Sequence, residues 1–165
     1  MHPNTEIVVA AARRAGLSIE PVSYPDGTRT AQEAARAIGV EVAQIVKSLV
    51  FDLVDEDGAG TEAEPVLALV SGADRLDEGL LAAAGGRQRA ARVDADRVRA
   101  VTGFPIGGVA PLGLPRPVRT FLDPGLLAHD EVWAAGGTPQ VVFGIAPHRL
   151  AEATRATVVD LASPA

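Results

Sequence analysis

The sequence predicts an α+β fold in a single domain over residues 1–165. Short candidate strands outnumber candidate helices and follow one another through tight turns, which favours α+β over a doubly wound parallel sheet. Hydrophobic residues make up 47% of the chain and charged residues 22%, as is usual for a folded globular protein. No repeat, low-complexity tract or linker divides the chain, whose length suits a single core.

The first elements are a helix, a strand and a second helix. Residues 5–15 show the amphipathic spacing of a helix, and residues 19–24 read as a short strand. Thr30 begins a capping box, because its hydroxyl can accept an orphan amide of the helix that follows. That helix covers residues 31–38 and ends at Gly39, where a left-handed residue is needed.

The centre of the chain predicts a pair of buried strands. Residues 44–54 form a nearly continuous apolar run, which is typical of a strand buried on both faces. Residues 55–60 are expected to be a loop, and residues 65–71 the returning strand. Asp74 is the expected N-cap of a helix that runs through residue 84.

The C-terminal half predicts five strands, two helices and a helical segment after the cap-like pair Asp123-Pro124. The strands are expected at 89–93, 118–122, 131–135 with 140–145 as a hairpin, and 157–161; the helices are expected at 94–102 and 147–154.

Composition narrows the possible locations. The chain has no cysteine, so disulfides and thiolate chemistry are excluded. Its first residues lack the pattern of a signal peptide, and no apolar run approaches the ~18 residues of a membrane span. We therefore expect a cytoplasmic protein without a membrane partner, whose oligomeric state the sequence leaves open.

Charge is unevenly distributed. The net charge of −6 argues against sequence-blind nucleic-acid binding through a wholly basic surface. An acidic tip is expected around residues 55–57, with Glu62 and Glu64. The clustered arginines form either a solvated helix face or a local phosphate-contacting patch. They are Arg87, Arg89, Arg92, Arg97 and Arg99.

Lys47 is the first candidate for chemistry. It is the one lysine of the chain, against fourteen arginines, and it lies within the apolar run 44–54. A buried ammonium must be paired, shift its pKa or meet an anion that a ligand supplies. Its stem could instead pack while its head reaches water. The residue alone leaves these two interpretations open.

The second candidate is the glycine- and proline-rich segment 102–113. Its glycines allow backbone amides to point together at a ligand, and its prolines keep the loop stiff. The spacing matches neither a phosphate-binding Walker loop nor a dinucleotide fingerprint. The alternative is a simple connection between elements.

Familiar catalytic sets are missing. His2, His129 and His148 occupy positions typical of surface histidines, and the pairs Asp55/Asp57 and Asp94/Asp96 occupy loop and cap positions. We expect no metal and no cofactor. A cation in an apolar strand and a stiff amide-rich loop suffice only for a substrate that is already reactive, such as an aminoacyl ester.

Several segments together resemble the YbaK/ProX family, free-standing relatives of the editing domain of bacterial prolyl-tRNA synthetase. The similar segments are 28–35, 44–51, 107–113, 136–138 and 146–150. The resemblance implies a mixed, partly open β-barrel with helices packed outside. It also implies an aminoacyl-tRNA deacylase of translation fidelity that uses a positioned water, with the tRNA acceptor end and prolyl-tRNA synthetase as partners.

The resemblance also implies roles for individual residues. Lys47 would bind phosphates or the terminal adenosine, and Gly107 and Gly108 would place backbone groups around the ester carbonyl and the water. Ile106, Val109 and Ala110 would limit the amino-acid pocket by volume. Substrate contacts would come from Ser48, Gly137 and Thr138, with weaker tRNA contacts from Arg87, Arg89 and Arg92.

The chain departs from the alanine-specific members at two positions. They typically carry asparagine where this chain has Ser48, and a histidine where it has Gly137-Thr138. The expected substrate is therefore only a small amino acid (alanine, cysteine, serine or threonine), on tRNA(Pro). Two alternatives stay open, namely a non-catalytic module that binds tRNA or a synthetase, and a protein that binds a small phosphometabolite.

Overall fold

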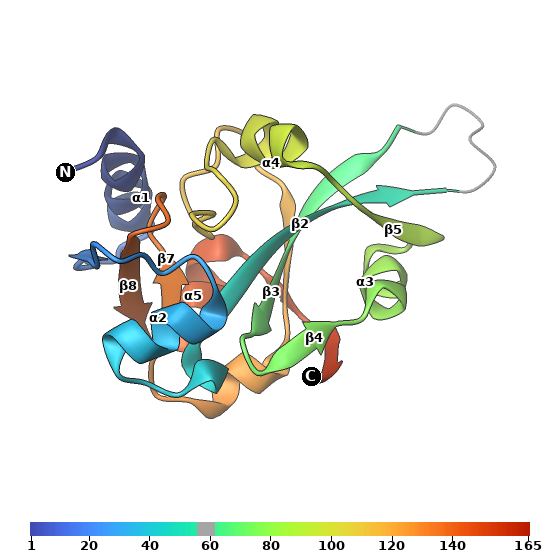
Figure 1. The fold of residues 1–165 in the computed structure, drawn as a ribbon. Helices are drawn as coiled ribbons and strands as arrows, with labels where there is room; N and C mark the ends of the chain where they lie inside the picture. Colours follow the sequence, from blue (N-terminus) through green and yellow to red (C-terminus); the bar gives the residue numbers. More distant parts are fainter. Residues whose placement is uncertain (56–61) are drawn as a thin grey trace.

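The computed structural model describes residues 1–55 and 62–165 (Figure 1). Of the expected loop 55–60, only Asp55 is described. Glu56 and Asp57 of the expected acidic tip lie outside the described residues. Five α-helices are found in this part of the chain: α1 (Pro3–Arg14), α2 (Ala31–Ile38), α3 (Glu78–Gly85), α4 (Ala95–Thr102) and α5 (Pro147–Thr154). Two short 3₁₀ helices, η1 (Val42–Gln44) and η2 (Pro124–Ala128), complete the helical elements of that part.

The strands of the described residues form three sheets. Their bounds are β1 (Val22–Ser23), β2 (Val46–Val54), β3 (Glu64–Ser71), β4 (Asp74–Leu76), β5 (Arg89–Arg92), β6 (Arg119–Leu122), β7 (Val132–Ala135), β8 (Val141–Ile145), β9 (Thr157–Val158) and β10 (Ala162–Pro164). The strand orders are β5-β2-β3-β6-β9, β1-β8-β7 and β10-β4.

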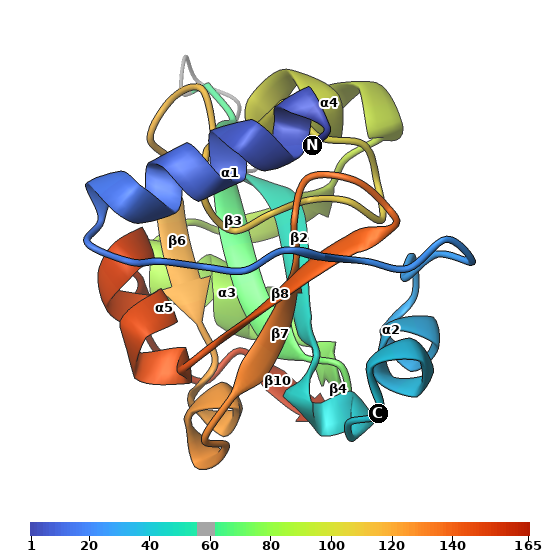
Figure 2. The ribbon, with the colours of Figure 1, turned by 90° about the vertical axis from the view of Figure 1, so that its left-hand side faces the viewer.

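The mixed α+β class is confirmed, but the described strands do not close into a barrel. The five-stranded and three-stranded sheets meet through an isolated bridge between Ile45 and Trp133, so their strands do not form one continuous ladder. Figure 2 shows α1 lying across one side of the sheets, with α5 and α2 at opposite ends.

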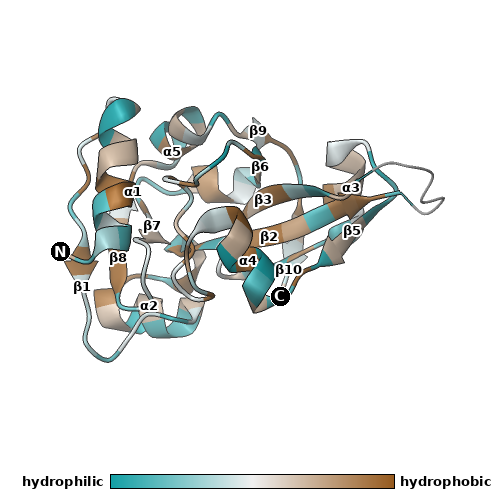
Figure 3. Cartoon of the chain, turned by 90° about the horizontal axis from the view of Figure 1, so that it is seen from above, coloured by the Kyte–Doolittle hydropathy of each residue, from teal (hydrophilic) through white to brown (hydrophobic). Residues whose placement is uncertain are grey.

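The predicted pair of buried strands is confirmed. β2 pairs antiparallel with β3, from Val46 opposite Ser71 to Leu53 opposite Glu64. One face of the pair packs against α1, α5 and the three-stranded sheet, and the other packs against α3. Figure 3 shows the hydrophobic residues concentrated along these central strands. Burial on both faces explains why the sequence shows a continuous apolar run instead of an alternating one.

Capping residues place two helices where the sequence predicts them. The Thr30 side chain accepts the Glu33 amide at 3.1 Å, and the Asp94 side chain accepts the Arg97 amide at 2.9 Å. Gly39 and Gly103 end α2 and α4 in the left-handed conformation, with φ of 86° and 82°. In each helix the N-cap and the terminal glycine lie within ten residues of each other, so local sequence determines where both helices begin and end.

Other predicted boundaries are wrong. Asp74 begins strand β4, which pairs with β10, and Asp77 is the residue that caps α3. The strand expected over 157–161 shortens to β9, and a separate strand, β10, follows it and pairs in a different sheet. The strand expected over 19–24 shortens to β1. In each case long-range strand pairing decides the outcome, and this pairing leaves no local signal.

The clustered arginines are largely engaged with carboxylates. Arg87 pairs with Asp55, Arg92 with Glu78 and Arg97 with Asp52, each at 2.9 Å. Arg89 lies exposed on β5 in the same region. Ion pairing lowers the positive charge that this region presents to a phosphate backbone, so the cluster fits the solvated surface better than the phosphate-contacting patch.

Glu64 supports a prediction on acid stability. Its hydrogen bonds from Arg119, at 2.7 and 2.8 Å, lower the pKa of Glu64 below the ordinary value of 4.5. The unfolded state therefore binds the proton first, so this stabilisation is complete above pH 4.5 and is lost as pH falls through the folded pKa.

We expect Glu64→Gln to flatten the pH dependence of the free energy of unfolding below about pH 4.5, measured by urea titration. Glu20→Gln is the control, because Glu20 is exposed and no ion pair to it is found in the described residues. An unchanged slope in the Glu64 variant would contradict the assignment.

Candidate functional site

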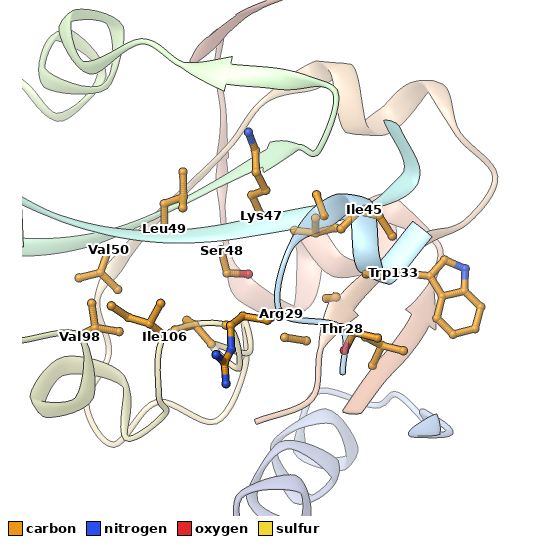
Figure 4. A pocket seen from close by; sticks show the side chains of 18 of the residues that line it. Thr28, Arg29, Ile45, Lys47, Ser48, Leu49, Val50, Val98, Ile106 and Trp133 are labelled. Carbon is orange, nitrogen blue, oxygen red and sulfur yellow. The ribbon is translucent and has the colours of Figure 1, made fainter. Parts of the chain in front are cut away.

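A cavity of about 390 Å³ lies between the two larger sheets. Its walls come from the first half of β2, from Ala31 and Ala34 of α2, from β7, and from the loop carrying Ile106 and Val109 (Figure 4). Most of these side chains are apolar, and the volume falls in the usual range for small-molecule sites.

Ser48 and Lys47 leave opposite faces of β2. Figure 4 shows the Ser48 side chain pointing into the cavity and the Lys47 side chain pointing away from it. The Lys47 Nζ atom donates a hydrogen bond to the carbonyl oxygen of Asp74, on β4. The ammonium is therefore directed away from the cavity, and the contact with phosphates or the terminal adenosine expected of it stays a prediction. Successive residues of a strand face opposite sides, so only one of the two can enter the cavity.

The environment of Lys47 disfavours its charge. Burial lowers the pKa of Lys47, Asp74 acts in the opposite direction, and Arg75 lowers the pKa further. The Asp74 carbonyl gives the ammonium one partner, which is what a partly buried cation needs. In this arrangement Lys47 connects β2 with β4.

The Ser48 hydroxyl has no hydrogen-bond partner in the described part of the chain, although its Oγ atom is buried. The indole nitrogen of Trp133, another cavity residue, is in the same situation. Leaving a buried hydroxyl unpaired costs about 1–3 kcal/mol. A ligand or an ordered water that supplies the missing partner would recover this energy, so Ser48 marks a polar point in an apolar cavity.

The glycine loop is a tight turn. The Gly108 amide donates to the carbonyl oxygen of Pro105 at 2.9 Å, and Gly107 takes a φ of 87°. Gly107, Ile106 and Val109 line the cavity. Gly108 is not among the lining residues, and its amide donates within the turn, so its expected place beside the ester carbonyl and the water stays a prediction. Ala110 is fully buried in the core.

The turn at residues 136–138 holds α1 instead of lining the cavity. Asn4 donates to the carbonyl oxygen of Gly137 at 3.0 Å, and Thr5 donates to that of Gly136 at 2.8 Å. The Thr138 side chain accepts the Gln140 amide at 3.2 Å. Gly137 and Thr138 thus lie outside the cavity wall, and the contacts of these two residues with the substrate stay predictions.

Arg29 is a cavity residue that the sequence analysis did not assign to the site. It is exposed, it lines the cavity, and its side chain lies on the same side of β2 as Ser48 (Figure 4). Its neighbour Thr28 is buried and fixed to the carbonyl oxygen of Pro139. The available signal was its place between Thr28 and the cap Thr30, in a segment that already resembled the family.

The charge at the cavity is one-sided. Among the described residues that line it, the ionisable ones are Arg29, Lys47 and Arg92, and none is an acid or a histidine. No group of three or more metal-ligating side chains is found in the described residues. In that same part of the chain, none of the helices has the length and apolar character needed to cross a membrane. The site can hold an anion and an apolar group, with Ser48 as a hydrogen-bonding point.

Comparison with known proteins agrees with this geometry. Residues 25–153 match the model of the aminoacyl-tRNA editing domain. The chain belongs to this family. The match spans α2, the cavity strand β2, the glycine loop and the hairpin β7–β8, which together form the walls described above.

Relatives of this editing domain include parts of larger enzymes and small separate proteins. A proline–tRNA ligase of Maridesulfovibrio salexigens is 34% identical over 72% of the chain, which spans only 19% of that ligase. A candidate Cys-tRNA(Pro)/Cys-tRNA(Cys) deacylase of Enterococcus faecalis is 24% identical over 80% of the chain and 76% of its own length. The crystal structure of a candidate trans-editing enzyme for prolyl-tRNA synthetase superposes with a TM-score of 0.86, at 43% identity and 99% coverage of both chains.

Proposed function

We propose that this editing domain hydrolyses the ester of mischarged aminoacyl-tRNA in the cavity beside Ser48. The observation that carries the proposal is a buried hydroxyl, unpartnered in the described residues, in a largely apolar cavity with no acid among its described lining residues. Family membership and the deacylase and editing names of the relatives support it.

The reaction needs one water and the reactive ester. The water oxygen bonds to the carbonyl carbon, the bond from that carbon to the ribose oxygen breaks, and the ribose oxygen takes a proton. The carboxylic acid that is formed then loses a proton to solvent. The Ser48 hydroxyl would orient either the water or the substrate ammonium, and positioning of this kind supplies much of the rate enhancement.

The amino acid is proposed to be small, with alanine, cysteine, serine and threonine as candidates, and the tRNA to be tRNA(Pro). The cavity of about 390 Å³ is larger than such side chains, so its remaining space would receive part of the terminal adenosine. Ile106 and Val109 would restrict the side chain by volume. Editing is needed because binding separates small side chains by only about 1–3 kcal/mol.

The roles of Lys47 and Gly107 stay predictions. Gly107 would border the ester, because it lines the cavity. Lys47 would act on the reaction as a positioning residue, by holding β2 against β4 through the Asp74 carbonyl. A direct role for its ammonium would require the side chain to leave Asp74 and pass to the other face of the strand.

The test is a deacylation panel with purified protein and alanyl-, cysteinyl-, seryl- and threonyl-tRNA(Pro). We expect release of the amino acid from at least one substrate well above the spontaneous rate, and no release from prolyl-tRNA(Pro). If every mischarged tRNA stays intact at micromolar protein, the proposal is wrong.

One observation favours a second candidate, a module that binds aminoacyl-tRNA or a synthetase without turnover. No histidine or carboxylate lines the cavity among the described residues, so no general base is in place there. This candidate predicts salt-sensitive association with tRNA in the same panel, with no amino acid released.

A further inference from the structure

We infer that Arg29 is the cation that receives a phosphate of the 3′-terminal nucleotides of the tRNA, at the mouth of the Ser48 cavity. This inference rests on the proposed function for the identity of its ligand, a single-stranded RNA end. It assigns to Arg29 the phosphate contact that the sequence analysis gave to Lys47.

The backbone at Arg29 is held from both sides. The Thr28 amide and the Thr28 hydroxyl both donate to the carbonyl oxygen of Pro139, at 2.6 and 3.1 Å. On the other side, Thr30 caps α2. With both neighbours fixed, the side chain starts from a defined point, and less entropy is lost when it binds a ligand.

The stem of Arg29 is fixed by the glycine loop. A Cβ atom placed on Gly107 would lie 2.6 Å from the Arg29 Cγ atom, so the absence of a side chain at Gly107 makes room for this stem. The positive φ of Gly107, 87°, also favours glycine there. Arg29 and the glycine loop therefore form one packed rim of the cavity.

The guanidinium is available to a ligand. No ion pair to Arg29 is found in residues 1–55 and 62–165, whereas Arg87, Arg92 and Arg97 pair with carboxylates. The Lys47 ammonium donates to Asp74 on the other side of β2. Figure 4 shows Arg29 beside Ile106, on the Ser48 side of the strand. Among the charged cavity residues, it is the one that lies on the Ser48 side of β2 and has no ion-pair partner in the described residues.

Geometry and charge together point to a phosphate. A guanidinium presents several donors in a planar fork that matches phosphate oxygens. With no acid among the described lining residues, an anion at the mouth meets no direct repulsion, although the chain carries a net charge of −6. In the proposed arrangement, an ester near Ser48 would have the phosphate of its own nucleotide at the cavity rim, where the exposed Arg29 lies.

The experiment compares Arg29→Gln, Arg29→Lys and Arg36→Ala with the unmodified protein. Gln keeps most of the stem that packs on Gly107, Lys restores the charge, and Arg36 is an exposed arginine of α2 outside the cavity lining. The probe is a fluorescent acceptor-stem RNA hairpin whose CCA end carries no amino acid. Its binding is measured by fluorescence anisotropy at several salt concentrations.

We expect Arg29→Gln to weaken binding roughly tenfold and Arg36→Ala to change it less than twofold. The salt slope of log K should fall by about 0.7, the value for one single-stranded phosphate contact, and Arg29→Lys should recover the slope and part of the affinity. Thermal unfolding checks that each variant is folded.

The inference is overturned if Arg29→Gln binds like the unmodified protein, if Arg36→Ala loses as much affinity as Arg29→Gln, or if the unmodified protein does not bind the hairpin. The RNA carries no amino acid, so the binding assay is independent of ester hydrolysis. Binding that depends on Arg29 without deacylation would leave this inference standing and reject the proposed activity, whereas deacylation that is indifferent to Arg29 would do the reverse.

Discussion

Replacing Ser48 by valine is expected to lower kcat/KM for deacylation by about 10- to 150-fold, while Ser48→Thr keeps most of the activity. Valine and threonine have nearly the same shape, so the pair isolates the hydroxyl group. A hydrogen bond to a charged group contributes about 1.5–3 kcal/mol, which gives this range if the hydroxyl holds the substrate ammonium.

Stability should change in the opposite sense. The Ser48 Oγ atom is buried without a partner in the described residues, so valine removes an unsatisfied polar group and should unfold at the same temperature as the unmodified protein or higher. The measurements are single-turnover deacylation and thermal unfolding of both variants. Equal activity of the valine and threonine variants would show that the hydroxyl takes no part in the reaction.

Gly108→Ala is expected to destabilise the fold by roughly 3 kcal/mol, a decrease of about 6–12 °C in Tm for a chain of this length. A Cβ atom at Gly108 would lie 2.7 Å from the Thr138 carbonyl carbon and 2.8 Å from its Cα atom. Both are backbone atoms, which cannot move aside as the end of a flexible side chain can. The glycine loop and the 136–138 turn must then separate, which displaces Ile106 and Gly107 and should reduce deacylation.

Gly103→Ala is the comparison variant, because it brings the cost of a left-handed residue without a close contact. Gly103 has a φ of 82° and open space around its Cβ position, so alanine there meets only the cost of a left-handed residue, about 1 kcal/mol. Calorimetric unfolding of both variants separates close approach from conformation. If Gly108→Ala is no more destabilising than Gly103→Ala, the tight contact between the two turns is not present in solution.

Sequence patterns predicted the elements whose signals are local. The caps Thr30 and Asp94 with the terminal glycines Gly39 and Gly103 placed α2 and α4, because each signal lies within one helix length. Asp74 and Asp77 show the limit of such signals. Either aspartate can cap a helix, and the choice depends on the pairing of β4 with β10, about ninety residues away along the chain.

The site shows the same limit. The apolar run around Lys47 revealed a buried strand, but a run without alternation does not tell which residues face which side. Ser48, Ile106, Gly107 and Val109 were expected in the site and do line the cavity. Whether Lys47 faces that cavity depends on packing across the sheet, which decides that its side chain points towards β4.

Arg29 was overlooked for a related reason. Arg29 lies in a segment that resembles the family, but its residue type is shared with thirteen other arginines, and its position at the cavity depends on the Thr28 contact with Pro139, more than a hundred residues away. Composition alone singles out Lys47, because it is the one lysine of the chain. Whether the Arg29 guanidinium is available to a ligand depends instead on which carboxylates lie near each cation. That information is tertiary.

The most direct test is a crystal structure of the protein with a non-hydrolysable aminoacyl-adenosine analogue, in which an amide replaces the ester. The aminoacyl group should occupy the cavity within hydrogen-bond distance of Ser48, with the adenosine 5′ oxygen directed towards Arg29. An analogue bound on the opposite face of β2, beside Lys47 and Asp74, would contradict the assignment of the site.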